Sequence, residues 1–274
     1  MPPTDLKNVE SHFEFGRNWA SYAKLIGDPE IAEATKGLLK LLQPVDLAGR
    51  TFLDIGCGSG LHALAASRLG VARIMAVDID PVSVETTKAV LSSRDLSVPW
   101  RAEQISVFDL DPARLGTFDV VYSWGVLHHT GHLQQAIERA AAMVAPGGLL
   151  ALALYRRTRA DWFWVREKKW YTGASPKAQK IAQRAYCALY QLSCLRSGTS
   201  YRAYVDTYRS ARGMDFFHDV HDWLGGYPYE SILATELGPR LEALGFKPVR
   251  VFAGAMTRGL LGSGCDEYVY KRTA

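Results

Sequence analysis

Residues 51–72 of this 274-residue chain read TFLDIGCGSGLHALAASRLGVA and contain the pattern that decides the fold. A short apolar run interrupted by Asp54 leads into a glycine-rich turn, and apolar residues then recur at helical spacing. Glycine is needed at such a turn because a Cβ would exclude positive φ values and keep a ligand away from the backbone. The pattern therefore predicts a strand, a tight turn and a helix whose first N–H groups favour an electronegative ligand.

Two later stretches extend this first unit. Residues 71–80 predict a second strand ending in Asp78, about twenty residues after the glycines, where nucleotide-binding folds place an acid against ribose hydroxyls. Residues 118–123, FDVVYS, predict a later strand that runs into WGVLHH. In order, these motifs resemble the class I S-adenosylmethionine-dependent methyltransferases, whose pattern is DxGCGxG, an acid closing the second strand, and FDxVxxxxVLHH. The glycines alone would also fit an NAD-type Rossmann enzyme, but the VLHH segment and Asp54 argue against that interpretation.

The resemblance implies an α/β fold with a Rossmann-like, seven-stranded, mostly parallel sheet, a reversed C-terminal hairpin, flanking helices and a helical lid insertion. Residues 46–155 and 231–274 are expected to form the methyltransferase domain, with residues 1–45 as an N-terminal helical cover. Residues 156–230 lose the strand–helix alternation and carry many aromatic and basic side chains. We interpret them as a helical substrate-binding insertion, because insertions at the carboxyl ends of the strands line the crevice of such sheets. Within them, the glycines, proline and clustered charges of residues 213–230 predict an irregular loop.

The composition sets outer limits on function. With 48% hydrophobic and 22% charged residues and a net charge of +4, the chain is typical of a globular protein, and the charge neither demands nor excludes nucleic acid. The four cysteines show no CxxC spacing, so we expect no metal. The first ten residues carry no signal segment, and no apolar run approaches membrane-spanning length. We therefore expect a cytoplasmic protein without a membrane partner and of undetermined oligomeric state. We also expect no nucleic-acid partner, because the candidate basic cluster in residues 156–169 is small.

Carried over position by position, the resemblance implies S-adenosylmethionine as the cofactor and S-adenosylhomocysteine as its product. Asp54 and the turn would hold the amino-acid end, and Asp78 would accept both ribose hydroxyls, since a carboxylate has two acceptor oxygens. The turn residues are Gly56, Cys57, Gly58 and Gly60. The other implied contacts are Ile79 beside the adenine, Ser106 and Val107 at its edge (with Asp109 as a second candidate), Ser123 and Trp124 beside the sulfonium, and Arg17, Trp19 and Tyr22 from the cover. For Trp19 and Tyr22, helical spacing fits packing as well as cofactor contact.

The catalytic group is less defined by the sequence. His129 is a candidate general base, although a histidine at this place also commonly caps the loop by hydrogen bonding. Asp222 and Tyr229, together with His218 and His221, are rival groups from the insertion. The expected activity is transfer of a methyl group to an O, N or S atom of a small-molecule metabolite. The alternatives are an RNA or protein methyltransferase, or a protein that binds S-adenosylmethionine without catalysis.

Overall fold

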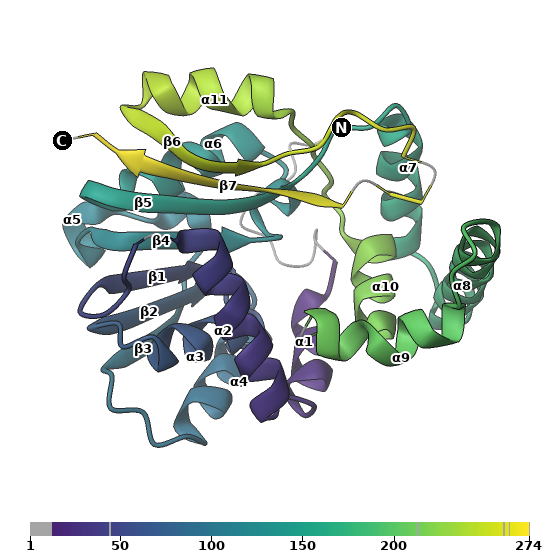
Figure 1. The fold of residues 1–274 in the computed structure, drawn as a ribbon, viewed down its shortest axis with the longest axis horizontal. Helices are drawn as coiled ribbons and strands as arrows, with labels where there is room; N and C mark the ends of the chain where they lie inside the picture. Colours follow the sequence, from purple (N-terminus) through teal and green to yellow (C-terminus); the bar gives the residue numbers. More distant parts are fainter. Residues whose placement is uncertain (1–12, 44, 213, 260, 263, 274) are drawn as a thin grey trace.

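A seven-stranded sheet forms the centre of the computed structural model, which describes residues 13–43, 45–212, 214–259, 261–262 and 264–273 (Figure 1). The strands are β1 (Thr51–Ile55), β2 (Arg73–Asp78), β3 (Trp100–Gln104), β4 (Phe118–Trp124), β5 (Val144–Tyr155), β6 (Phe246–Phe252) and β7 (Cys265–Arg272). Their order is β3-β2-β1-β4-β5-β7-β6, and β7 runs antiparallel to both of its neighbours. The predicted sheet with its reversed C-terminal hairpin is confirmed.

Helices cover both faces of this sheet. The helices nearest to it are α2 (Asp28–Leu42), α3 (Leu61–Arg68), α4 (Pro81–Ser92), the short α5 (Pro112–Leu115), α6 (Leu133–Ala142) and α11 (Ala234–Ala243). Side chains of α6 and α11 share one core with Leu53 and Val121, whereas side chains of α2 and α3 share another with Phe52 and Val120. Successive strand residues point to opposite faces. The central strands β1, β4 and β5 are buried on both faces and are therefore rich in apolar residues, whereas the edge strands β3 and β6 are largely exposed.

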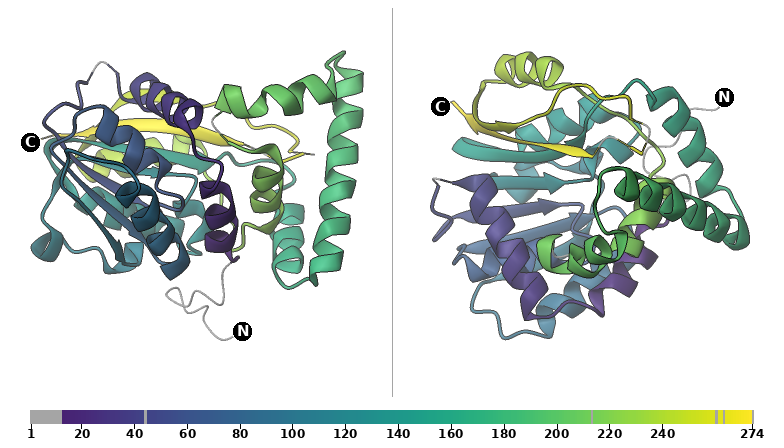
Figure 2. Two further views of the ribbon diagram at one scale, coloured as in Figure 1. Left: turned by 90° about the horizontal axis from the view of Figure 1, so that it is seen from below. Right: turned by 45° about the vertical axis from the view of Figure 1, so that its right-hand side comes forward.

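The remaining helices lie beyond the carboxyl ends of the parallel strands (Figures 1 and 2). They are α1 (Phe15–Ala23), α7 (Asp161–Thr172), α8 (Pro176–Arg196), α9 (Tyr201–Arg212) and α10 (Phe216–Gly225). The last four fall between β5 and α11 and share an aromatic core that includes Tyr171, Tyr186 and Phe216. Among the described residues, no helix is long and apolar enough to cross a membrane.

The prediction of an irregular loop over residues 213–230 is wrong for its central part, which forms α10. Asp215 caps this helix, since its side chain accepts hydrogen bonds from the backbone N–H groups of Phe217 and His218, at 3.1 and 3.0 Å. Phe216, Val220 and Leu224 recur every four residues and are all buried. The four-residue spacing of these apolar side chains therefore indicates a helix, whereas the glycines and proline of residues 225–228, at and after its end, are typical of a loop.

Candidate functional site

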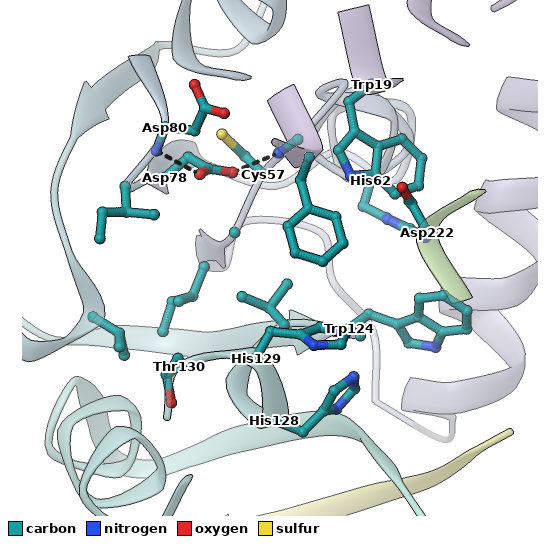
Figure 3. Close-up of a pocket in the computed structure, with 18 of the residues that line it drawn as sticks. Trp19, Cys57, His62, Asp78, Asp80, Trp124, His128, His129, Thr130 and Asp222 are labelled. Carbon is teal, nitrogen blue, oxygen red and sulfur yellow. Dashed lines mark hydrogen bonds between the residues drawn. The ribbon is translucent and has the colours of Figure 1, made fainter. Parts of the chain in front are cut away.

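A cavity of about 380 Å³ lies at the carboxyl ends of the parallel strands (Figure 3). The turn after β1, the end of β2 and the segment after β3 line one part of it. The segment after β4, the ends of β5 and β7, and helix α10 line the other part. Helix α1 lies against both parts, since Trp19 packs beside Gly58 and the ring centroid of Phe15 lies 5.1 Å from that of His129. Both the glycine turn and the VLHH segment therefore border a single cavity, as expected for ligands of open α/β sheets.

The glycine turn adopts a backbone that only glycine accepts readily. Gly56, Gly58 and Gly60 have φ angles of 76°, 52° and 77°. A Cβ on Gly56 would lie 2.4 Å from the side chain of Val126, and one on Gly58 would lie 3.3 Å from the ring of Trp19. The turn thus supports close packing on both sides while its backbone borders the cavity. Gly60 itself does not line the cavity; it is the N-cap of α3.

Asp78 braces this turn from the end of β2. Its Oδ2 accepts from the backbone N–H of Gly58 at 3.1 Å, and its Oδ1 accepts from that of Asp80 at 2.9 Å. Burial raises the pKa of Asp78 to about 6, although these two hydrogen bonds partly oppose the shift. Asp78 lines the cavity, so its carboxyl group is placed to meet a hydrogen-bond donor or a cation there.

Asp54 lies behind the turn and does not line the cavity. Its side chain is buried, and its Oδ2 has no hydrogen-bond partner among the described residues. Burial, followed by the nearby charge of Asp78, raises the pKa of Asp54 to about 7. Two carboxyl groups therefore share one buried region, and a cationic ligand in the cavity would favour the ionised form of both.

The segment after β3 differs in detail from the prediction. The strand ends at Gln104, and Ser106 caps the 3-10 helix Val107–Asp109 by accepting from the N–H of Phe108 at 3.4 Å. Ile79, Ser106 and Val107 line the cavity, whereas Asp109 is exposed and does not.

Of the three candidate cofactor contacts from the N-terminal cover, only one borders the cavity. Trp19 lines the cavity, but Tyr22 is buried in the core shared with α2, and Arg17 is an exposed side chain paired with Glu14 at 3.1 Å. Helical spacing thus correctly indicated packing for Tyr22. The start of α1 is held at the site by the N–H of Gly16, which donates to Asp80 Oδ2 at 3.0 Å.

Of the two candidates at the end of β4, only Trp124 borders the cavity. Its Nε1 donates to Glu267 Oε1 at 3.0 Å, which links β4 to β7. Ser123 is buried beneath, where its Oγ donates to the carbonyl oxygen of Ile55 at 3.1 Å. The structure therefore gives Ser123 a place in the contact between β1 and β4.

His128 and His129 both line the cavity, and their ring centroids are 4.3 Å apart. The Nδ1 of His129 lies 2.9 Å from the carbonyl oxygen of Pro228, so it carries the proton and leaves Nε2 as an acceptor. The Nδ1 of His128 instead accepts from the N–H of Tyr155 at 3.2 Å, so its proton is on Nε2. The two adjacent rings therefore have opposite tautomers.

The protonated Nε2 of His128 is a buried donor with no hydrogen-bond partner among the described residues. Burial, and then the neighbouring His129 and Lys168, hold the pKa of His128 well below its ordinary value, so this ring is neutral. A buried donor without a partner is costly. Because this atom is also closed off from solvent, a ligand oxygen meets it only after the ring or its surroundings shift.

The candidates from the insertion also separate. Asp222 lines the cavity and accepts from Asn18 Nδ2 at 2.7 Å; burial and then Asp219 raise its pKa well above the ordinary value. Tyr229 lies outside the cavity, and its hydroxyl donates to Asp161 at 3.3 Å. The positions of His129 and Asp222 are thus compatible with chemistry in the cavity, whereas Tyr229 faces away from it.

Several cavity residues were not assigned to the site from the sequence. They include Phe13, Phe15, His62, Asp80, Tyr155, Asp219, Trp223, Cys265 and Glu267. Among the described lining residues, the carboxyl groups are Asp78, Asp80, Asp219, Asp222 and Glu267, and there is no lysine or arginine. A search of the described ranges also finds no group of three potential metal ligands. Residues on β5 and β7 gave no local signal, because only the strand order brings them to the cavity.

Part of this chain is similar to known methyltransferases. Residues 53–152 match the family described as "Methyltransferase domain". The ubiquinone biosynthesis O-methyltransferase of Xanthomonas oryzae pv. oryzae (strain PXO99A) is 35% identical over 116 residues, which are 42% of this chain and 47% of that protein. The ribosomal protein L11 methyltransferase of Aliivibrio salmonicida is 34% identical over 141 residues, 49% of this chain and 45% of that protein. The chain therefore spans about half the length of the curated relatives it matches.

Solved structures support the fold. Magnesium protoporphyrin IX methyltransferase from Synechocystis PCC 6803 with bound SAH has a TM-score of 0.52 at 13% identity, covering 89% of this chain and 84% of that one. PKMT2 from Rickettsia typhi in complex with AdoHcy has a TM-score of 0.55 at 17% identity, covering 89% and 52%. Residues 53–152 therefore match a methyltransferase domain, and the solved structures show that the chain shares the fold of these methyltransferases, as the motifs predicted.

Proposed function

We propose that this chain is an S-adenosylmethionine-dependent methyltransferase that methylates a neutral hydroxyl group of a small molecule, in the cytoplasm and without nucleic acid as substrate. The observation that carries this proposal is that the glycine turn with Asp78 and the histidine pair border the same cavity. One part of the cavity suits a nucleoside with a cationic sulfur, and the other suits a hydroxyl acceptor.

The residues around the glycine turn fit the cofactor. A turn without Cβ atoms allows close approach to the backbone, and the two oxygens of Asp78 match the two ribose hydroxyls. Ile79 and Val107 offer apolar surface for the base. The buried carboxyl of Asp54, whose Oδ2 has no hydrogen-bond partner among the described residues, lies behind the turn, and a cation in the cavity would favour its ionised form. When bound, the cofactor supplies an activated methyl group, so the protein needs no nucleophile of its own.

The histidine pair favours oxygen as the acceptor atom. We infer that a hydroxyl oxygen accepts from the Nε2–H of His128 after a small shift of this buried ring, while its own proton points toward the Nε2 of His129. An amine that reacts through its only lone pair cannot also accept a hydrogen bond, and a thiol forms weak hydrogen bonds. His128 would then orient the acceptor, and His129 would remove its proton, which is worth about 10²–10⁴ in rate.

The charge of the lining favours a neutral acceptor. A carboxylate or phosphate group would find carboxyl groups and no lysine or arginine among the described lining residues, although the raised pKa of Asp222 lowers the negative charge there. The buried amine of Lys168 lies behind the lining, 5.7 Å from the ring centre of Tyr155, and donates to the carbonyl oxygen of Trp223. The ubiquinone biosynthesis O-methyltransferases among the relatives also support a hydroxyl acceptor.

The proposal is tested first by calorimetric titration of S-adenosylmethionine into the protein. Radiolabelled cofactor is then supplied with fractionated cell extract and with a panel of neutral phenols and alcohols, amines, thiols and carboxylates. We expect cofactor binding and label in a neutral hydroxyl compound. Label that enters only RNA or protein, or only amines, would overturn the assignment of the acceptor, and absence of cofactor binding would overturn the whole proposal.

Two histidine variants test the assigned roles. His129→Ala should slow methyl transfer about 10²–10⁴-fold while the cofactor affinity is unchanged, because the cofactor contacts lie on other elements. His132→Ala is the matched control, since His132 is exposed and does not line the cavity. Equal turnover in both variants would exclude His129 as the base.

A further inference from the structure

Helices α7 and α8 carry an unusual share of the exposed apolar surface. Eight of the sixteen exposed large apolar side chains among the described residues belong to these two consecutive helices. On α7 they are Trp162, Phe163, Val165 and Trp170, and the two tryptophan side chains are 65% and 54% exposed. A concentration of this kind in one part of a surface marks an interaction site more often than chance exposure.

The outward face of α8 forms a continuous apolar stripe. Ile181, Ala185, Ala188, Leu192 and Leu195 follow one another at intervals of four, three, four and three residues, and all are exposed. These intervals place them on one side of the 21-residue helix.

A different face of α8 packs against the rest of the insertion. Tyr186 and Cys194 are buried, and the hydroxyl of Tyr186 donates to the carbonyl oxygen of Leu261 at 2.8 Å. The apolar stripe is therefore not needed for the packing of α8 onto the protein.

Positive charge flanks this stripe. Helix α8 contains no aspartate or glutamate, and Lys177, Lys180 and Arg184 are exposed along it. On α7, Arg166 and Lys169 are exposed, and the guanidinium of Arg166 lies 5.6 Å from the ring centre of Trp162. Apolar and tryptophan side chains bordered by lysine and arginine are the features of helices that lie in a membrane interface.

We propose that the exposed faces of α7 and α8 form a docking surface for an anionic lipid bilayer. Figure 2 shows α8 along the outer edge of the molecule, so the sheet does not lie between this helix and an approaching plane. The apolar stripe enters the acyl boundary, and the basic side chains contact the anionic headgroups. The sequence predicts no membrane partner, because no apolar run is long enough to span a bilayer, but docking at the surface requires no spanning segment.

A second copy of this chain fits the same surface less well. In a symmetric dimer each α8 would meet an identical α8, so Lys180 and Arg184 of one copy would face a helix that has only basic charges. An anionic bilayer instead complements both the charge and the apolar stripe. The proposal is independent of the proposed methyl acceptor, because none of these side chains lines the cavity.

The test is flotation of the full chain with vesicles of phosphatidylcholine, alone or mixed with phosphatidylglycerol. We expect binding to the mixed vesicles, weaker binding to phosphatidylcholine alone, and a decrease with rising salt. Lys180→Gln with Arg184→Gln should weaken binding roughly 25-fold, at about fivefold for each basic residue. Trp162→Ser with Ile181→Gln and Leu195→Gln should abolish it.

The control replaces three exposed apolar side chains elsewhere, Leu39→Gln with Val82→Gln and Leu244→Gln, which are 41–42% exposed, and should bind as the unmodified chain does. Circular dichroism and light scattering accompany each variant. Failure of the unmodified chain to bind mixed vesicles, or equal binding by the α7–α8 variant, would overturn the proposal. A dimer that dissociates on Ile181→Gln with Leu195→Gln would instead assign the surface to a second copy.

Discussion

Gly226 offers a test of His129 that leaves the histidine itself in place. A Cβ added at Gly226 would lie 2.3 Å from Cε1 of His129 and 3.0 Å from both ring nitrogens. The φ angle of Gly226 is −45°, so alanine is not excluded by a left-handed backbone. Carbon atoms in contact lie about 3.5–4.0 Å apart, so Gly226→Ala must move the imidazole ring or the turn by roughly 1 Å.

The expected cost follows from this displacement. A misplacement of about 1 Å lowers the rate roughly 10²-fold, and complete loss of the base costs at most about 10⁴-fold. A hundredfold loss corresponds to about 2.7 kcal/mol of activation free energy. The affinity for S-adenosylmethionine should not change, because the hydrogen bonds of Asp78 and of the glycine turn do not involve Gly226 or His129.

The assay is methyl transfer to the acceptor identified by the labelling screen, with cofactor affinity measured by calorimetry and the His129 tautomer measured by ¹⁵N NMR. Gly37→Ala is the matched control, because a Cβ on this residue of α2 meets no atom within 4 Å. Combining Gly226→Ala with His129→Ala should cause no further loss beyond His129→Ala. Unchanged turnover in Gly226→Ala, with NMR showing a displaced ring, would refute the role of His129 as base.

Three further predictions concern the carboxyl groups. Asp78→Ala should weaken cofactor binding roughly 10- to 100-fold in calorimetry, since charge-assisted hydrogen bonds are lost. Asp109→Ala, outside the cavity, should leave the affinity unchanged. Equal cofactor affinities of the two variants would contradict the assignment of Asp78 to the ribose. Burial raises the pKa of Asp54 from 3.8 to about 7, so the folded state binds more protons than the unfolded state and loses stability as the pH rises between these values. The melting temperature of Asp54→Asn should therefore fall less over that interval than that of the unmodified chain. Parallel curves of melting temperature against pH would contradict this expectation. Asn18→Ala removes the donor to Asp222 and should lower the free energy of unfolding by about 1–3 kcal/mol, as measured by urea denaturation. An unchanged denaturation midpoint would contradict this prediction.

The features that the sequence predicted well are local ones. A strand, its turn and the next helix are consecutive in the chain, so Gly58 and Asp78 could be placed at one edge of the sheet from spacing alone. The same holds for His129, which ends the 3-10 helix Leu127–His129 shortly after β4. In each case the residue lies at or shortly after the end of a strand, so no distant partner is needed to define its position.

The remaining features depend on contacts between segments that are far apart in the chain. Trp19 and Tyr22 share one helix and similar chemistry, yet only Trp19 borders the cavity, because the orientation of α1 depends on its contacts with Asp80 and α10. Glu267 reaches the site because β7 inserts beside β5. The tautomer of His129 depends on Pro228, which lies 99 positions further along the chain and which no spacing rule identifies.

Helix α1 connects the two parts of the cavity. At its start, the N–H of Gly16 donates to Asp80, which also caps α4 directly after Asp78. Two residues further on, Asn18 donates to Asp222 of α10 at 2.7 Å, and the backbone N–H of Phe13 donates to the carbonyl oxygen of Tyr227 at 3.0 Å. A single short helix thus bonds to the end that fits the cofactor and to the end that fits the acceptor. Any ligand that orders α1 against Asp80 also stabilises the positions of α10 and of the turn that holds His129, so binding at the two ends of the cavity is expected to be cooperative.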